Sequence, residues 1–533
     1  MSSVVFQFSI MVGQIPHFAA SLLFKCIEVP SCSLKVRIAT MHAFLAMPAS
    51  SSSHFLPVKI LAAILPAVIL CACTSSPTAK EQIAARVIVP RHWLQTEAGN
   101  DTPAASSLDV TALASWWMRF NDPVLDRLII DALANSPDIR TALSKIAESR
   151  ARRAVEKSSL LPTLSAGVTG RESYSRDHLA HTSTSGDSYS ASLDAGWEID
   201  LFGRQRLALD AATADLAQTR ENFHAAQVSL AAEVADAYVT LRSGENQLAV
   251  LERNIASRTE TTQLTLWREQ AGLASALDTQ QSLSTLEQAR ASLPSLRQTI
   301  AESRNRLALL CGRAPGALDS LLAETRPVPA PPTALATGIP AETLRQRPDI
   351  RAAEHALEAA TSRTDAARRE RLPSLNLAGS IGVETLNAGD LLSPDNTVAS
   401  LLGSLTAPIF QGGRIRQNIL IQTELQKQAL IAYESSVLTA LNEVENALVA
   451  VRRLAERTAI LDAAANAATT AADLAARQYE AGQVDLLTVL DAQRTRLGIE
   501  EQQVSATASL TAAHIQLYKA LGGGWGGQPA ATP

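Results

Sequence analysis

Residues 189–201 read YSASLDAGWEIDL, and their alternation decides the class of fold. The odd positions carry Tyr, Ala, Leu, Ala, Trp, Ile and Leu, whereas the even positions carry Ser, Ser, Asp, Gly, Glu and Asp. A period of two residues predicts a β-strand with one apolar and one polar face. Residues 163–171 and 374–384 alternate in the same way, and residues 400–410 do so more weakly. The sequence therefore predicts four strands of about ten residues each.

The composition of the polar face bears on where these strands lie. A half-buried sheet on a soluble core would also alternate, but Ser, Asp, Glu and Gly suit a face that lines water. Segments 172–188 and 385–397 are polar without periodicity, so we expect exposed loops there. Single-chain membrane barrels begin at about eight strands. If this sheet lies in a membrane, several chains must contribute to it.

Two uninterrupted segments predict unusually long helices. The span from Arg204 to Ala271 contains no proline and one glycine, Gly244, and the span from Arg414 to Ala481 contains neither. Each covers 68 residues (271 − 204 + 1), or about 100 Å as one continuous helix. Charged and amide side chains recur throughout both spans, which excludes membrane-spanning helices. Helices of this length must bury an apolar stripe against neighbours, so we expect packed hairpins.

Short motifs recur at a nearly constant offset, which indicates a duplicated unit. The motif PDIR at 137–140 recurs at 348–351, and LPTL at 161–164 recurs as LPSL at 372–375, both 211 residues later. We predict the order helix, strand, loop, strand, long helix, turn and long helix in each copy. The predicted organisation is a first repeat at 135–325, a Pro-rich linker at 326–345, a second repeat at 346–523 and a tail at 524–533.

The N-terminal region predicts export and a lipid anchor. An apolar run from Ile60 to Leu70 follows Lys59 and has the length of the hydrophobic region of a signal peptide. The next residues, Leu70-Cys71-Ala72-Cys73, resemble a lipobox, so we expect cleavage before Cys73 and lipid on its thiol. A plain secretory signal with an incidental cysteine is the alternative. We expect residues 1–46 to precede the true start, 47–72 to be the lipoprotein signal peptide, and 73–134 to be a lipidated segment that enters the first repeat.

Charge and missing motifs exclude several classes of function. The chain has 47 basic and 52 acidic residues, a net charge of −5, and no basic block, so we expect no nucleic acid partner. The motifs HExxH, GxSxG and a Walker glycine loop are absent from the sequence, so we expect neither an enzyme nor a metal site. His178 and His181 are expected to be exposed loop residues and Cys311 a small buried residue. Apart from lipid on Cys73, no cofactor is predicted.

Further motifs follow one another along residues 73–523. They are Trp116-Trp117-x-x-Phe120-x-Asp122-Pro123, both PDI and both LPxL motifs, Leu201-Phe202-Gly203-Arg204, Gln411-Gly412-Gly413-Arg414, Tyr479-x-Ala481-Gly482 and Leu490-Asp491-Ala492-Gln493-Arg494. Each motif alone is weak evidence for membership of a protein family. In this order, and together with the duplication, the sequence resembles the TolC-type outer-membrane efflux proteins, in particular their NodT-like or OprM-like lipoprotein branch.

The resemblance implies an α+β fold: a duplicated unit whose long α-helical hairpins form a periplasmic α-barrel, plus four β-strands that contribute to a trimeric, 12-stranded (3 × 4) transmembrane β-barrel. It implies a lipid-anchored homotrimer among the lipids of the outer membrane of a Gram-negative bacterium. Such proteins are passive exit ducts for drugs and other small toxic compounds. They work with a periplasmic membrane-fusion adaptor and an inner-membrane pump, here expected to be of the RND type.

Two other functions remain open at the level of sequence. A TolC-like duct can instead serve type I protein secretion. A lipid-anchored periplasmic coiled-coil scaffold without a pore would also use long helices.

The resemblance also assigns a periplasmic gate to Tyr479, Leu487, Asp491 and Arg494. The last three are spaced by four and three residues, which puts them on one helical face. In a trimer, Asp491 would form a carboxylate ring tied closed by Arg494, and Leu487 an apolar constriction. An ordinary exposed ion pair is the alternative. The family sometimes carries a second Asp where this chain has Thr488, so we expect a weaker or less cation-selective gate.

The turns and the strands supply the other predicted site residues. The turns Ala271-Gly272-Leu273 and Ala481-Gly482-Gln483 are expected to be the hairpin tips that dock the adaptor, with glycine in a left-handed conformation. In the barrel, we expect Asp194, Glu198 and Asp200 to face the lumen and favour cationic cargo. Tyr189 and Trp197 are expected to face lipid.

Overall fold

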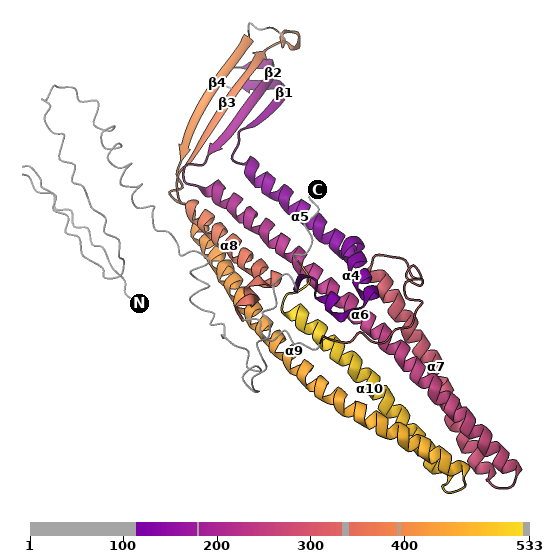
Figure 1. Cartoon of the computed structure of the whole chain (residues 1–533). Helices are drawn as coiled ribbons and strands as arrows, with labels where there is room; N and C mark the ends of the chain where they lie inside the picture. Colours follow the sequence, from indigo (N-terminus) through magenta and orange to yellow (C-terminus); the bar gives the residue numbers. More distant parts are fainter. Residues whose placement is uncertain (1–112, 178–180, 333–340, 392, 394–395, 526–533) are drawn as a thin grey trace, which may run out of the picture. The chain divides into compact units, whose positions relative to one another are not determined.

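The computed structural model describes residues 113–177, 181–332, 341–391, 393 and 396–525. The predicted signal peptide, Cys73 and His178 therefore lie outside the described residues. The first repeat contains η1 (Trp116–Phe120), α4 (Pro123–Asn135), α5 (Pro137–Ser158), β1 (Thr163–Asp177), β2 (Thr182–Ile199), α6 (Arg204–Gln270) and α7 (Ala276–Leu310). The second contains η2 (Ala341–Gln346), α8 (Pro348–Arg369), β3 (Ser374–Thr385), η3 (Ala388–Asp390), β4 (Thr397–Thr406), α9 (Arg414–Glu480) and α10 (Leu486–Ala520) (Figure 1).

The two repeats match helix by helix. α5 and α8 each have 22 residues, α6 and α9 each have 67, and α7 and α10 each have 35. The prediction of a duplicated α+β unit is confirmed, and the two long helices end within one residue of the expected positions. None of the helices in the described part of the chain is both long enough and apolar enough to cross a membrane.

The strands form one antiparallel sheet in the order β1-β2-β3-β4. Its register aligns apolar residues with apolar residues, because Leu193 of β2 stands opposite Ala166 on one side and Ile381 on the other. One position further along, Asp194 stands between Ser165 and Ser380. The predicted division into an apolar and a polar face is therefore confirmed across β1, β2 and β3, whereas β4 places Val398 and Leu402 on the polar face.

The prediction of a loop at 172–188 is wrong. β1 continues to Asp177 and β2 begins at Thr182, with pairs such as Tyr174 opposite Ser185. Polar side chains on both faces of this extension remove the alternation that marks a half-apolar strand, while Thr, Tyr and paired backbone groups still favour a strand. The fourth strand covers residues 397–406 rather than 400–410, and it ends two residues before Pro408, which cannot donate to a strand ladder.

The main hydrophobic core lies among the helices and includes no residue of the four described strands. Trp116 is fully buried there and stacks on Tyr518 with ring centroids 5.4 Å apart. Apolar strand residues are instead exposed: Val168 by 78% and Leu401 by 84%. The interpretation as a half-buried sheet on a soluble core is therefore wrong for this chain.

The motif that ends in Asp122-Pro123 joins the N-terminal helices to this core. The Asp122 carboxylate accepts hydrogen bonds from the N–H groups of Val124 (2.9 Å) and Leu125 (3.4 Å), so it caps α4, and Pro123 occupies the first helical position. Its other oxygen accepts a 2.7 Å hydrogen bond from the hydroxyl of Tyr238 on α6. The capped turn thereby holds α4 against α6.

The helices pack in two rows. α5 packs on α6, α6 on α8 and α8 on α9 in the half that adjoins the sheet, because α5 and α8 lead directly into β1 and β3. In the other half, α7 packs on α6, α6 on α10 and α10 on α9. α6 and α9 each begin beside the sheet and end at a hairpin turn (Figure 1). At about 1.5 Å per residue, each separates the sheet from the turn by about 100 Å.

Candidate functional site

The two hairpin turns have the same backbone geometry. After α6, the N–H of Gly272 donates to the carbonyl of Glu269 and the N–H of Leu273 donates to that of Arg268; Gly482 and Gln483 repeat this pattern after α9. Gly272 and Gly482 have φ of 71° and 73°, the left-handed conformation that glycine adopts without strain. The prediction of left-handed glycine at both turns is confirmed. All six predicted tip residues are exposed, namely Ala271, Gly272, Leu273, Ala481, Gly482 and Gln483.

Three of the four predicted gate residues lie together. Leu487, Asp491 and Arg494 line a groove of about 640 Å³ between α7 and α10. The Arg494 guanidinium donates to the Asp491 carboxylate over 2.7 Å, and the two side chains are 80% and 65% exposed. Within one chain an ion pair this exposed contributes only about 0.5 kcal/mol. Their assignment to a gate depends on neighbouring copies and stays a prediction.

Tyr479 lies elsewhere, in a contact between the two hairpins. Its side chain is 5% exposed, and the Arg268 guanidinium of α6 lies over its ring, 4.6 Å from the centroid. Arg268 also donates to the Tyr479 carbonyl over 2.6 Å, and the Thr265 hydroxyl is 3.3 Å from the phenol oxygen. Tyr479 therefore ties α9 to α6 within one chain. Sequence reasoning missed Arg268, because a partner 211 residues away leaves no local signal.

Thr488 and Asp485 complete the start of α10. The Asp485 carboxylate accepts both the hydroxyl (2.5 Å) and the N–H (3.0 Å) of Thr488. These hydrogen bonds hold the pKa of the Asp485 carboxyl below its usual range. Both groups are thus used in capping the helix, and position 488 presents no charge to the groove.

The groove contains more positive than negative charge. Arg258 of α6 also lines it, is only 7% exposed, and donates to the Asn254 side chain (2.7 Å) and the Thr285 carbonyl (3.0 Å). Burial lowers the pKa of Arg258, but a guanidinium stays protonated at neutral pH. The lining of the groove therefore contains two guanidinium groups and one carboxylate, that of Asp491, which weakens the expected attraction for cations.

The tip of the first hairpin is the more apolar of the two. Trp267, Leu273 and Leu277 are 59%, 70% and 65% exposed. At the offset of 210 residues, the second hairpin carries Arg477, Gln483 and Leu487 in their place. Trp267 was missed by sequence reasoning, because a single Trp within a long amphipathic helix reads as a packing residue.

The acidic strand residues differ in their surroundings. The Asp194 carboxylate accepts a hydrogen bond from the Ser192 hydroxyl (2.8 Å) on the polar face, and Glu198 pairs with Arg204 at 2.7 Å. Asp200 lies beyond the end of β2 and accepts hydrogen bonds from the N–H groups of Gln205 (3.3 Å) and Arg206 (3.0 Å). Its side chain is only 7% exposed. The structure thus makes Asp200 a cap of α6, where the sequence placed it on the lumen face of a strand.

Trp197 is on the apolar face of β2, as predicted, and is 38% exposed. Its indole N–H donates to the carbonyl of Leu160, just before β1, over 3.0 Å. The ring therefore combines an apolar face with a satisfied polar group, as aromatic residues do at the edge of a membrane.

The sequence matches a family model described as "Outer membrane efflux protein" at residues 128–313 and 339–523. It is 33% identical over 477 residues to the outer membrane protein OprJ of Pseudomonas aeruginosa, covering 87% of this chain and 96% of that protein. It is 32% identical over 435 residues to the toluene efflux pump outer membrane protein TtgF of Pseudomonas putida, covering 81% and 89%.

Solved structures give the same picture. The outer-membrane channel OprN superposes with a TM-score of 0.76 at 30% identity, covering 85% of this chain and all of that one. The open state of the Neisseria gonorrhoeae MtrE outer membrane channel superposes with a TM-score of 0.70 at 31% identity, covering 82% and 96%.

Proposed function

Because the chain belongs to the outer membrane efflux protein family, we propose that it is the exit duct of a tripartite efflux system. It is an outer-membrane channel of a Gram-negative bacterium and not an enzyme. In this role it passively conducts drugs or other small toxic compounds to the outside. A periplasmic adaptor and an inner-membrane pump, which we expect to be of the RND type, supply the cargo and the energy.

The observation that carries the proposal is a sheet that is incomplete in one chain. Among the described residues, β1 and β4 each pair on one side only, so the sheet has two open edges. Over β1, β2 and β3 one face is apolar and exposed, with Leu164 and Leu193 at 72% and 48%, and the other is polar. An apolar face needs lipid, a polar face needs water, and an open edge in lipid leaves backbone groups unpaired at a cost of several kcal/mol each.

A closed ring of several copies satisfies all three requirements. If β4 of one copy pairs with β1 of the next, no edge remains, the apolar faces point to lipid and the polar faces enclose water. Three copies supply 3 × 4 = 12 strands, as expected from the family resemblance. We therefore propose a homotrimer.

Lipid on Cys73 would hold the chain at the same membrane. The support is the apolar run that ends at Leu70 and the small residue Ala72 before the cysteine. Mass analysis of the mature chain tests the assignment: a Cys73→Ser variant should lose the lipid mass and the cleavage. A lipid mass retained in that variant would contradict the assignment.

Gene deletion tests the function itself. We expect a deletion strain to become more susceptible to a panel of antibiotics, detergents and metal ions, and a plasmid copy of the gene to restore tolerance. Unchanged tolerance combined with loss of an exported protein would contradict the efflux proposal and favour a secretion duct.

A further inference from the structure

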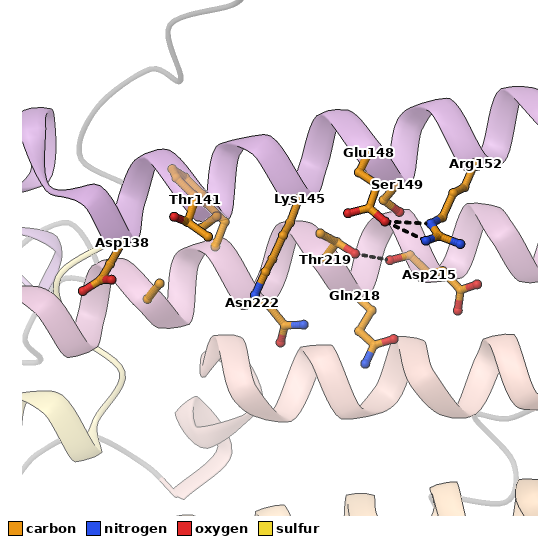
Figure 2. A pocket seen from close by; sticks show the side chains of 13 residues that line it. Asp138, Thr141, Lys145, Glu148, Ser149, Arg152, Asp215, Gln218, Thr219 and Asn222 are labelled. Carbon is orange, nitrogen blue, oxygen red and sulfur yellow. Dashed lines mark hydrogen bonds and ion pairs between the residues drawn. The ribbon is translucent and has the colours of Figure 1, made fainter.

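A groove of about 700 Å³ lies between α5 and α6, and its side chains come from one face of each helix (Figure 2). We call it the α5–α6 groove. Arg153 of α5 donates to the Thr213 hydroxyl of α6 over 2.9 Å, so residues of these antiparallel helices at one level have numbers that sum to about 366. Lys145 is then level with residue 221 of α6 and Asp138 with residue 228. This register gives the position of each lining residue along the groove.

Two charged groups in the groove have no partner among the described residues. They are the Lys145 ammonium and the Asp138 carboxylate, for which the structure shows neither an ion pair nor a hydrogen bond. The other charged groups are paired, as Glu148 with Arg152 (2.7 Å) and Asp215 with Arg363. Lys145 and Asp138 are exposed and seven residues apart on α5, so they share a face of the helix at a separation of about 10 Å. The groove thus offers one free positive and one free negative charge.

The stretch between these two charges is apolar. By the register of the helices, Ala142 of α5 and both Phe223 and Ala226 of α6 line it. Phe223 is partly buried and packs against the main core, which holds its ring in place.

Uncharged polar groups complete the groove on the side of Lys145. Figure 2 shows Lys145 extending across the groove toward Asn222 of α6. Ser149 is only 9% exposed, and its hydroxyl makes no hydrogen bond to any described residue. A buried hydroxyl without a partner in the protein is available to a ligand. The end of the groove near Lys145 therefore suits a group that accepts hydrogen bonds.

The groove opens on the side of α6 that continues the polar face of the sheet. Arg204, at the start of α6, pairs with Glu198 on the polar face of β2 (2.7 Å). At about 100° per residue, the groove residues of α6 point on average within about 30° of Arg204. His224 points about 170° away from them, where its ring centroid lies 4.7 Å from that of Trp525 in the C-terminal segment. If the polar faces of several copies enclose water, the α5–α6 groove lines the same water-filled path.

We propose that the α5–α6 groove is a weak binding site for zwitterionic amphiphiles, small molecules that carry a carboxylate and an ammonium at opposite ends of a flat apolar body. The Lys145 ammonium binds the carboxylate, the Asp138 carboxylate binds the ammonium, and the apolar body lies on Phe223. Exposed charges bind weakly, which suits a duct that must release what it takes up. This inference rests on the proposed efflux duct and names a class of cargo for it.

Binding of ciprofloxacin to the full chain, purified in detergent, tests the site. This fluorescent molecule has a flat aromatic body with a carboxylate at one end and an ammonium at the other, and its methyl ester lacks only the negative charge. Fluorescence anisotropy measures the affinity of both compounds for the wild type, Lys145→Met and Asp138→Asn. The matched control is Lys157→Met, because Lys157 is an exposed lysine of the same helix outside the groove.

We expect Lys145→Met to weaken ciprofloxacin binding about fivefold and to leave binding of the ester unchanged, because only the zwitterion has a carboxylate for the ammonium to bind. Asp138→Asn should weaken the binding of both compounds, and Lys157→Met that of neither. Equal affinity of the wild type and Lys145→Met for ciprofloxacin, or no saturable binding to the wild type, would overturn the site.

The proposed function is decided by a separate measurement. If the wild-type gene restores drug tolerance to a deletion strain but the purified chain shows no binding that depends on Lys145, the groove is overturned and the efflux duct stands. If the gene does not restore tolerance, the efflux duct fails, and with it the assignment of the groove to cargo.

Discussion

Asp491 holds the only carboxylate among the charged residues that line the groove at the hairpin tips, beside Arg494 and the buried Arg258. Its ion pair is weak in one chain, so its effect depends on the charges that several copies bring together. The excess of guanidinium groups implies that the carboxylate mainly restrains Arg494. Removing it should loosen the constriction and shift the pore toward anions.

We predict that Asp491→Ala raises ion conductance in planar bilayers and shifts the reversal potential toward anion selectivity. Asp473→Ala is the matched control, because Asp473 forms an exposed ion pair with Arg496 (3.3 Å) on the same hairpin but outside the groove. Equal conductance in the two variants would remove Asp491 from the gate.

Asp236 of α6 is a second residue that leads to a testable prediction, because its carboxyl makes the stability of the chain depend on pH. Burial raises the pKa of its carboxyl from 3.8 to about 6, although Gln516 donates a 2.7 Å hydrogen bond to one oxygen. Its other oxygen is buried without a partner among the described residues. The pKa of this carboxyl is higher in the folded chain than in the unfolded chain, so the folded chain holds the proton up to a higher pH. The free energy of unfolding therefore falls as the pH rises from about 4 to about 6, and it stays lower above about pH 6.

We predict that Asp236→Asn raises the free energy of unfolding at pH 7 by about 1–2 kcal/mol, after allowance for partial exposure. The amide oxygen can still accept from Gln516. The gain should disappear below pH 4, where the wild-type carboxyl is protonated in both states. Denaturant unfolding at pH 4 and 7 measures the difference, and a gain that does not vary with pH would contradict the assignment.

Site residues could be predicted from the sequence where their geometry is local. Leu487, Asp491 and Arg494 share a face because helical spacing alone places them there. Tyr479 was grouped with them, but its ring is buried by Arg268 of the other hairpin, and no spacing encodes a contact between repeats. Asp200 was assigned by strand alternation, yet the N–H groups at the start of α6 bind it.

At the scale of elements, predictions succeeded where the local sequence marks the end of a helix or shows the two-residue alternation of a strand. The long helices ended as expected because Gly272 and Gly482 terminate them. The strands were found where one face is apolar, and the extension across 172–188 was missed because both of its faces are polar. The packing order of the helices could not be predicted from the sequence, because their amphipathic faces do not specify which neighbouring helix they contact.

The two hairpin tips give a prediction at this scale. An exposed aromatic residue in an apolar patch contributes more to a protein contact than an exposed Arg at its rim. We therefore expect Trp267→Ala to reduce efflux-dependent drug tolerance more than Arg477→Ala, its equivalent in the second hairpin. Both variants should reach the outer membrane in normal amounts. Equal tolerance would contradict a dominant role for the first hairpin in docking the adaptor.

At the scale of the whole molecule, the described part of the chain has two edges, and the strand at each edge lacks a pairing partner on its outer side. Among the described residues, β1 and α5 lie at one edge, and β4 and α9 lie at the other. A single chain therefore exposes an apolar sheet face and two strand edges that a stable monomer in water would bury. Assembly within a membrane is the arrangement that removes all of them together.

Imaging the full chain after purification in detergent tests this central claim most directly. The account predicts particles with threefold symmetry in which twelve strands surround a water-filled lumen. Particles of one or two chains, or a threefold assembly whose sheets remain open at their edges, would contradict it.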